Sequence, residues 1–239
     1  MKTVRKIFVF TCFFCISRIS VCAQNLPFSN FGLPYINNDS LYRRSISNHP
    51  EKQMISLETI PGIILDLRYA SDNNFMHKNL YPKNTNSTFL RKRVYQALVL
   101  VAKDLAKRGL VLNIFDAYRP YYITELIWIQ VNDERYAANP AKGSSHNRGI
   151  AVDLTIADAK TKQLLPMPTS FDNFSDTAHQ GYMGVDSERI KNRELLKRVM
   201  QKYGFIPLQT EWWHFSWPVS GNYEVLNLSF DQLKANQNN

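Results

Sequence analysis

The stretch from residue 91 to residue 118 constrains the fold most, because one amphipathic helix leads directly into a strand. In "RKRVYQALVLVAKDLAKRGL" the apolar residues recur at helical spacing. They are Val94, Ala97, Leu98, Val101 and Leu105. Gly109 is typical of a helix C-terminal cap. The following "LVLNIFDAY" has the unbroken apolar character of a buried strand, which ends at "DAYRP".

Further elements alternate between strands and helices along the chain. "IILDLRY" and "IAVDLTIAD" predict strands, and "FIPLQTEWWHFSW" predicts the last strand region. A short helix is expected in "YYITELIWIQV" after Pro120. A second long helix is expected in "DSERIKNRELLKRVMQKYG", capped by Ser187 and ended by Gly204. This mixture indicates an α+β fold with a sheet that is at least partly antiparallel.

Size and composition are those of a globular protein. The chain has 239 residues, of which 44% are hydrophobic and 21% charged, enough for one domain with a real core. Beyond the N-terminus no apolar run reaches 18 residues, so no transmembrane helix is expected.

The N-terminal sequence "MKTVRKIFVFTCFFCISRISVCAQ" predicts an export signal over residues 1–23. A basic start precedes a short apolar stretch, and the small residues of "VCA" favour cleavage after Ala23. Two alternatives are an N-terminal anchor helix and lipidation at Cys22. Residues 24–55 are polar and rich in Asn, Ser and Pro, and we interpret them as an N-terminal arm.

Cleavage of this signal would change both the cysteine count and the charge. All three cysteines lie within it, so the mature chain would form no disulfide and use no thiol chemistry. The full chain carries +9, with 29 basic and 20 acidic residues; the signal holds four of the basic ones and no acid, which leaves +5. The excess is spread along the chain, so nucleic acid is not expected as a partner.

Two histidines lie near acidic residues in a pattern that suggests a catalytic or metal site. "SSHNRGIAVD" places His146 seven residues before Asp153, the acid of an otherwise apolar strand, and "EWWH" places Glu211 close to His214. Two histidines and a carboxylate are a common ligand set for a catalytic zinc that keeps one open position. Each residue by itself is more often structural. We interpret the other three histidines as surface residues: His49, His77 and His179.

The motifs "SSHNRGIAVDLT" and "EWWH", together with "DAYRP" and "PMPTSFDNF", closely resemble the zinc D-alanyl-D-alanine dipeptidases. These enzymes are the VanX-like branch of the Hedgehog/DD-peptidase fold, and the similarity runs from about Ile63 to Trp217. The resemblance implies a central, mostly antiparallel sheet flanked by helices. It also implies that residues 56–239 form a single metallopeptidase domain.

The resemblance further implies a role for each main site residue. His146, Asp153 and His214 would bind one Zn²⁺ per chain. Glu211 would be the general base that takes a proton from the attacking water and passes it to the leaving amine. Arg119 would stabilise the tetrahedral oxyanion.

Four more positions match the family's pocket, with less specific motifs. Ser144, Tyr69 and Asp172 would contact the substrate, and Asp116 would be a supporting carboxylate. Alternatives remain open at this point: Arg119 could simply pair with Asp116 at a strand end, Asp172 could be a turn residue, and Tyr69 could face the core with a bonded hydroxyl.

The "EWWH" motif poses a geometric problem. In a regular strand Glu211 and His214 would face opposite sides. We therefore predict that the backbone bends, bulges or turns between them. Trp212 and Trp213 would then wall the pocket and hold its ligands in place.

The expected function is that of an exported, periplasmic or secreted zinc dipeptidase that hydrolyses D-Ala-D-Ala in cell-wall peptide turnover. The alternative is a peptidoglycan D,D- or L,D-carboxypeptidase, decided by whether the segment between Arg119 and His146 and the loop 160–183 close the pocket. A non-catalytic wall-binding module would be expected to lack Glu211 or Arg119, and both are present.

A His₂Asp site also accepts manganese or cobalt. The sequence predicts no oligomeric state.

Overall fold

The computed structural model describes residues 26–218 and 223–237. The predicted signal and all three cysteines lie outside these ranges. Among the described residues, no helix combines the length and the apolar character needed to cross a membrane.

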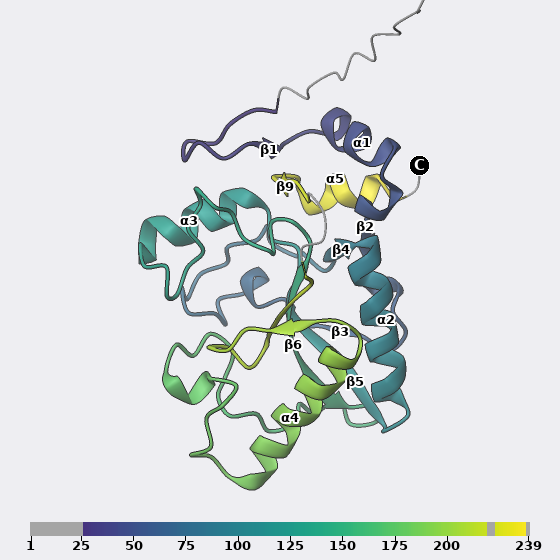
Figure 1. Ribbon diagram of the computed structural model, residues 1–239, viewed down its shortest axis with the longest axis vertical. Helices are drawn as coiled ribbons and strands as arrows, with labels where there is room; N and C mark the ends of the chain where they lie inside the picture. The colour runs from purple at the N-terminus through teal and green to yellow at the C-terminus, as the bar shows by residue number, and fades with distance from the viewer. Residues whose placement is uncertain (1–25, 219–222, 238–239) are drawn as a thin grey trace, which may run out of the picture.

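A five-stranded sheet forms the centre of the molecule (Figure 1). Its strands, in spatial order, are β3 (Ile64–Leu65), β5 (Leu110–Asp116), β6 (Ala151–Asp158), β8 (His214–Ser216) and β7 (Ile206–Pro207). Only β3 and β5 run parallel; each of the other neighbouring pairs is antiparallel. The expected α+β class with a mostly antiparallel sheet is therefore confirmed.

Three helices follow the predicted pattern. They are α2 (Lys92–Ala106), α3 (Tyr121–Val131) and α4 (Ser187–Lys202). The apolar stripe of α2 is buried as expected, and α2 packs against β5 and α4. Gly109 ends the α2 region with a φ of +70°. Because a side chain is strained at such a φ, glycine is favoured there.

Two local expectations were wrong. "IILDLRY" is a strand only at Ile64–Leu65, after which the chain turns into a 3₁₀-helix, η3 (Arg68–Ala70). The Asp66–Arg68 ion pair (2.8 Å) lies at this change of direction. Ser187 does not cap α4: the carboxylate of Asp186 accepts the Arg189 N–H at 2.9 Å, because Asp186 has the extended backbone that a capping residue needs.

The central strand β6 is buried on both faces. Leu154 and Ile156 lie opposite Ile114 and Leu112 of β5 and form part of the apolar core. The residues that alternate with them, Asp153 and Thr155, point to the other face. Asp153 is only 3% exposed, so its charge must be compensated by neighbouring groups.

The predicted N-terminal arm is folded over its described part. It contains β1 (Tyr35–Ile36), α1 (Asp39–Ser47), η1 (Pro50–Lys52) and, ending one residue past the arm, β2 (Met54–Ser56). These elements pack against the C-terminal segment and against β4, as Figure 1 shows. The elements that they contact are β4 (Phe89–Arg91), β9 (Val225–Leu226) and α5 (Phe230–Ala235). Two further 3₁₀-helices are η2 (Leu57–Thr59) and η4 (Asp176–Ala178). The Nε of Arg43 donates to Asn236 at 2.9 Å, which joins α1 to the end of α5.

Candidate active site

Three neighbouring strands bring three polar residues into one row. Asp153 on β6 lies opposite Asp116 on β5 and opposite His214 on β8. The β5–β6 register shifts between Ile114 and Asp116, which marks a bulge just before "DAYRP". Bulges re-aim side chains near active sites. The sheet thus supplies a rigid platform for three of the predicted site residues.

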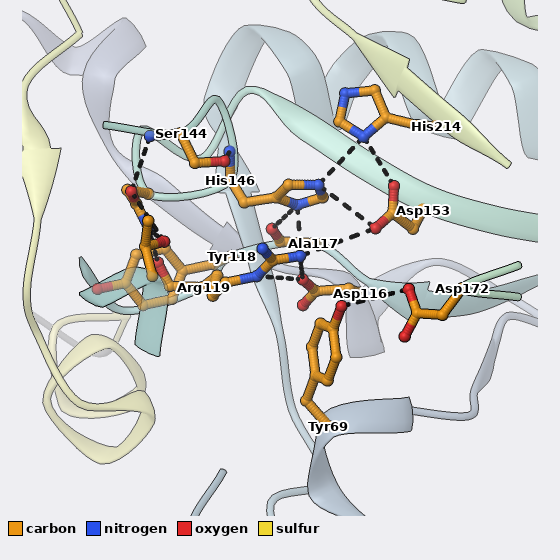
Figure 2. Close-up of polar contacts among 12 residues, drawn as sticks. Tyr69, Asp116, Ala117, Tyr118, Arg119, Ser144, His146, Asp153, Asp172 and His214 are labelled. Atoms are coloured by element: carbon orange, nitrogen blue, oxygen red, sulfur yellow. Dashed lines mark hydrogen bonds and ion pairs between the residues drawn. The ribbon is translucent and has the colours of Figure 1, made fainter. Parts of the chain in front are cut away.

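His146, Asp153 and His214 form a compact ligand set (Figure 2). The Nε2 of His146 lies 3.3 Å from Nδ1 of His214 and 3.4 Å from Oδ2 of Asp153. The His214 Nδ1 lies 2.9 Å from Oδ1 of Asp153. Zinc ligands at 2.0–2.1 Å in a tetrahedron are separated by about 3.3 Å, so the donor atoms fit such an ion.

The ring of His146 is oriented by the main chain. Its Nδ1 donates to the carbonyl oxygen of Ala117 at 2.7 Å, which fixes the ring with Nε2 facing Asp153. The loop that carries His146 ends at Gly149, where φ is +68°. A Cβ at Gly149 would lie 2.5 Å from Cε of Met54, so a larger residue would displace the end of that side chain and would also be strained at this φ.

Glu211 and His214 reach the same cavity because a turn separates them. Strands β7 and β8 form a hairpin, and the chain between them turns over residues 208–213. The Leu208 N–H donates to His214 O at 3.0 Å, which closes this turn. The predicted irregularity is confirmed: His214 begins β8, whereas Glu211 lies in the turn before it.

The two tryptophans of "EWWH" differ in position. Trp213 lines the cavity and packs edge-on against Phe171. Trp212 does not wall the pocket as expected; its Nε1 donates to Thr169 at 2.9 Å, away from the cavity. The two rings touch edge to face, with centroids 5.4 Å apart, and both are nearly fully buried.

Arg119 both pairs with Asp116 and lines the cavity. Its Nε and Nη2 lie 2.9 and 2.8 Å from Oδ2 of Asp116, and its guanidinium lies 4.9 Å from the centre of the Tyr69 ring. Asp116 also accepts the hydroxyl of Tyr81 at 2.6 Å. The pairing fixes the direction of Arg119, whose Nη2 is 4.0 Å from Asp153.

The remaining predicted residues surround the same space. Ser144 lines the cavity, and its Oγ accepts the His146 N–H at 3.2 Å. Tyr69 is buried and donates its hydroxyl to Oδ1 of Asp172 at 3.4 Å, as Figure 2 shows. Asp172 sits in a turn with a φ of +59°, a strained value for a residue with a side chain, and strain of this kind clusters at functional sites.

Burial and charge shift the pKa values of the site. Burial opposes the ionisation of Asp153, but His146 and His214 outweigh it and hold its pKa well below the usual range. Burial raises the pKa of Glu211. Burial, with the Asp153 charge, raises the pKa of Asp172 to about 8. Burial by itself would lower the pKa of His214, but the Asp153 carboxylate raises it above the usual value.

Several residues of the site carry no signal in the sequence. Asn147, completely buried, donates to Arg119 O at 2.8 Å and accepts the Ser144 N–H at 2.8 Å. It lies inside "SSHNRG", and its type alone does not distinguish it from a loop residue. Tyr136 and Phe174 line the cavity from two loops without periodicity.

The site now defines a class of protein. A buried His₂Asp set, a carboxylate of raised pKa and a fixed arginine share one cavity of about 270 Å³. Three residues that could hold a metal ion, next to a buried carboxylate and a fixed cation, are the groups expected in a metallopeptidase.

The comparisons name the family. The family model described as Peptidase_M15, D-ala-D-ala dipeptidase, matches residues 51–232, so the chain belongs to this peptidase family. The D-alanyl-D-alanine dipeptidase of Escherichia coli K12 is 32% identical over 73% of this chain and 89% of its own length. That of Enterococcus faecium is 28% identical over 66% of this chain and 87% of its own.

A more distant likeness exists among solved structures. The LdcB LD-carboxypeptidase is 17% identical, with a TM-score of 0.41 over 69% of this chain and 67% of that chain. This level supports no conclusion about fold or function. The family assignment, together with the mostly antiparallel α+β architecture, is what confirms the expected fold class.

Proposed function

We propose that the protein is an exported, zinc-dependent dipeptidase that hydrolyses D-Ala-D-Ala to D-alanine in cell-wall peptide turnover. One observation carries the proposal: the metal ligand set, Glu211, Arg119 and Asp172 all line a single small cavity. The relatives that bear the name D-alanyl-D-alanine dipeptidase support the same substrate.

His146, Asp153 and His214 would hold the zinc, which supplies a Lewis acid that polarises the scissile carbonyl and acidifies water. The structure supports this ligand set through the donor separations and through the orientation of His146 by Ala117. His₂-carboxylate sites that keep one open position are a common catalytic zinc arrangement.

Glu211 would move the protons. Its burial raises its pKa, which makes the carboxylate a better proton acceptor at neutral pH. In the proposed reaction it accepts the proton of the attacking water and donates it to the leaving amine. Groups in such a role typically contribute about 10²–10⁴-fold to the rate.

Arg119 would stabilise the negative charge that develops on the carbonyl oxygen. Asp116 holds the guanidinium by two contacts, so little reorganisation is needed during the reaction. Donors of this kind contribute about 3–4 kcal/mol in transition-state stabilisation.

Asp172 would receive the substrate's ammonium group. Its raised pKa means that it is largely protonated near neutral pH without a cationic partner. A bound ammonium would favour the carboxylate, because an opposite charge at short range stabilises the ionised form. Tyr69 would orient Asp172 through its hydroxyl, and Ser144 lines the same cavity.

Export rests on the sequence of residues 1–23, which lie outside the described residues. Fractionation of cells that express the full chain, with mass spectrometry of its N-terminus, tests it. We expect Gln24 as the first residue of a protein found outside the cytoplasm. A lipid-modified Cys22 as the first residue would make the protein a lipoprotein, and an uncleaved chain would contradict the signal.

The activity is tested with three substrates: D-Ala-D-Ala, L-Ala-L-Ala and a stem pentapeptide that ends in D-Ala-D-Ala. We expect release of D-alanine from the first substrate with one zinc per chain. Glu211→Gln should retain the zinc and lose the activity, whereas Glu188→Gln, an exposed carboxylate on α4, should change neither. Cleavage of the pentapeptide in preference to the dipeptide would assign a carboxypeptidase, and zinc binding without any cleavage would indicate a binding module.

A further inference from the structure

Three aromatic side chains from three separate loops meet in the lining of the cavity. The Phe174 ring packs edge-on against Phe75, with centroids 5.1 Å apart, and in a tilted arrangement against Tyr136, with centroids 5.0 Å apart. All three residues line the cavity that holds the metal ligand set. We call this group the aromatic bridge. It joins the segment after α3, which carries Tyr136, to the segment after β6, which carries Phe174.

The aromatic bridge is anchored beside Asp172. Phe174 follows Asp172 by two residues, and the backbone N–H of Phe75 donates to Oδ2 of Asp172 at 3.4 Å. The other oxygen of Asp172 accepts the hydroxyl of Tyr69. Two of the three bridge residues are therefore held by the same short turn that positions this carboxylate.

Tyr136 is the outer member of the bridge. It is 37% exposed and lies in a compact turn, in which its N–H donates to Asp133 O at 3.0 Å. The guanidinium of Arg135, which pairs with Asp133, lies 5.1 Å from the centre of the Tyr136 ring. These local contacts hold Tyr136 against Phe174 rather than leaving it extended into solvent.

The location of the bridge bears on substrate length. Under the proposed function the ammonium of D-Ala-D-Ala binds at Asp172. Any longer peptide that ends in D-Ala-D-Ala continues from this amino end, not from the carboxyl end. A continuing chain would have to pass the point where Phe174 contacts Phe75 and Tyr136.

We propose that the aromatic bridge of Phe75, Phe174 and Tyr136 closes the amino end of the cavity and limits this enzyme to dipeptides. The inference rests on the proposed function and adds the residues that set the substrate length. The cavity of about 270 Å³ lies at the small end for ligand pockets, which agrees with a short substrate.

The test compares substrates of two lengths. We would measure kcat/KM for D-Ala-D-Ala and for L-Ala-D-Ala-D-Ala in wild type, Tyr136→Ala and Phe174→Ala. The quantity compared is the kcat/KM for the tripeptide divided by that for the dipeptide. Opening the bridge should raise this ratio by about 10-fold or more, within the range by which pocket contacts discriminate between related substrates. Because Tyr136 is partly exposed, its truncation leaves no closed cavity in the core.

Two controls separate closure from general disturbance. Tyr136→Phe keeps the ring and should keep the wild-type ratio. Tyr122→Ala removes a tyrosine of equal exposure, 37%, on α3 outside the cavity lining, and should also keep it. An unchanged ratio in both Tyr136→Ala and Phe174→Ala, with dipeptide cleavage retained, would overturn the inference, as would a wild type that already cleaves the tripeptide well.

Peptide binding distinguishes failure of this inference from failure of the proposed function. Calorimetry with the two peptides would be done in Glu211→Gln and in Glu211→Gln combined with Tyr136→Ala. If Tyr136→Ala increases the affinity for the tripeptide, the proposed role of the aromatic bridge is supported even when no peptide is hydrolysed. The absence of hydrolysis would then contradict only the proposed function. No gain in tripeptide binding or cleavage refutes the bridge.

Discussion

Asp153 on β6 and His214 on β8 face each other across adjacent antiparallel strands, with Oδ1 and Nδ1 2.9 Å apart. His146 reaches the same point from a loop, and its ring is fixed by Ala117. Two of the three proposed ligand atoms are thus set by strand register, and sites on strands are held more precisely than sites on loops.

Replacement of Asp153 by Asn should abolish metal binding and activity together. The substitution removes the negative charge that both histidines face. Loss of an outer-shell partner already costs about 10–100-fold in metal affinity, so loss of a ligand should cost more. Metal analysis after dialysis checks this. Glu211→Gln is the matched comparison, because it should lose activity and keep the metal; a zinc-loaded Asp153→Asn would remove Asp153 from the ligand set.

Removal of the metal should lower both activity and thermal stability. A ligand that binds only the folded state adds about 2.7 kcal/mol when present at 100 times its Kd. For a domain of this size that amount corresponds to a decrease in Tm of several degrees on chelation. Calorimetry before and after dialysis against a chelator, and after return of Zn²⁺, measures it. If chelation abolished the activity but left Tm unchanged, the metal would not contribute to the stability of the folded protein.

Asp172 should make the metal-free protein less stable as the pH rises. Its pKa is about 8 in the folded protein, against 3.8 without burial, so the folded state binds the extra proton between these values. Stability must then decrease with increasing pH across this window and level off above pH 8. The Tm of Asp172→Asn, which cannot ionise, should exceed that of wild type by an amount that grows from pH 4 to pH 8. A constant difference would contradict the raised pKa.

The same substitution should impair the reaction. Without its carboxylate the site loses the partner proposed for the substrate's ammonium, so KM for D-Ala-D-Ala should rise. Steady-state kinetics of the metal-loaded variant at pH 7 would show whether the gain in stability is accompanied by this loss. An unchanged KM would leave Asp172 as a turn residue only.

Asn147 should act as a positioning residue for Arg119 and Ser144. Its replacement by Ala leaves buried groups unpaired, the carbonyl of Arg119 and the N–H of Ser144 among them. We expect a loss of about 1–3 kcal/mol in the free energy of unfolding and a decrease in kcat larger than any change in KM. Urea unfolding and kinetics measure both. Asn86→Ala, at an exposed position, should be neutral; lower stability with unchanged kcat would restrict Asn147 to a structural role.

Local patterns in the sequence account for the long elements. The helix α2 and the strand β6 are found where apolar spacing predicted them, and β5 is found where an unbroken apolar run predicted a buried strand. The break between Glu211 and His214 was predictable for a related reason: alternation in a strand forbids both from meeting one metal. The short strands β1, β7 and β9 were not separately predictable, since two residues carry no period.

The sequence by itself determined the candidate groups: the residues proposed as ligands, base and oxyanion donor, their order along the chain, and the family that they indicate. The tertiary structure decided which of these groups meet. Register places Asp116, Asp153 and His214 side by side, and long-range packing brings Tyr136 to Phe174 across 38 positions of chain. Such contacts depend on the packing of distant segments, so no local periodicity encodes the contacts within the cavity lining or the folding of the N-terminal arm onto the C-terminal helix.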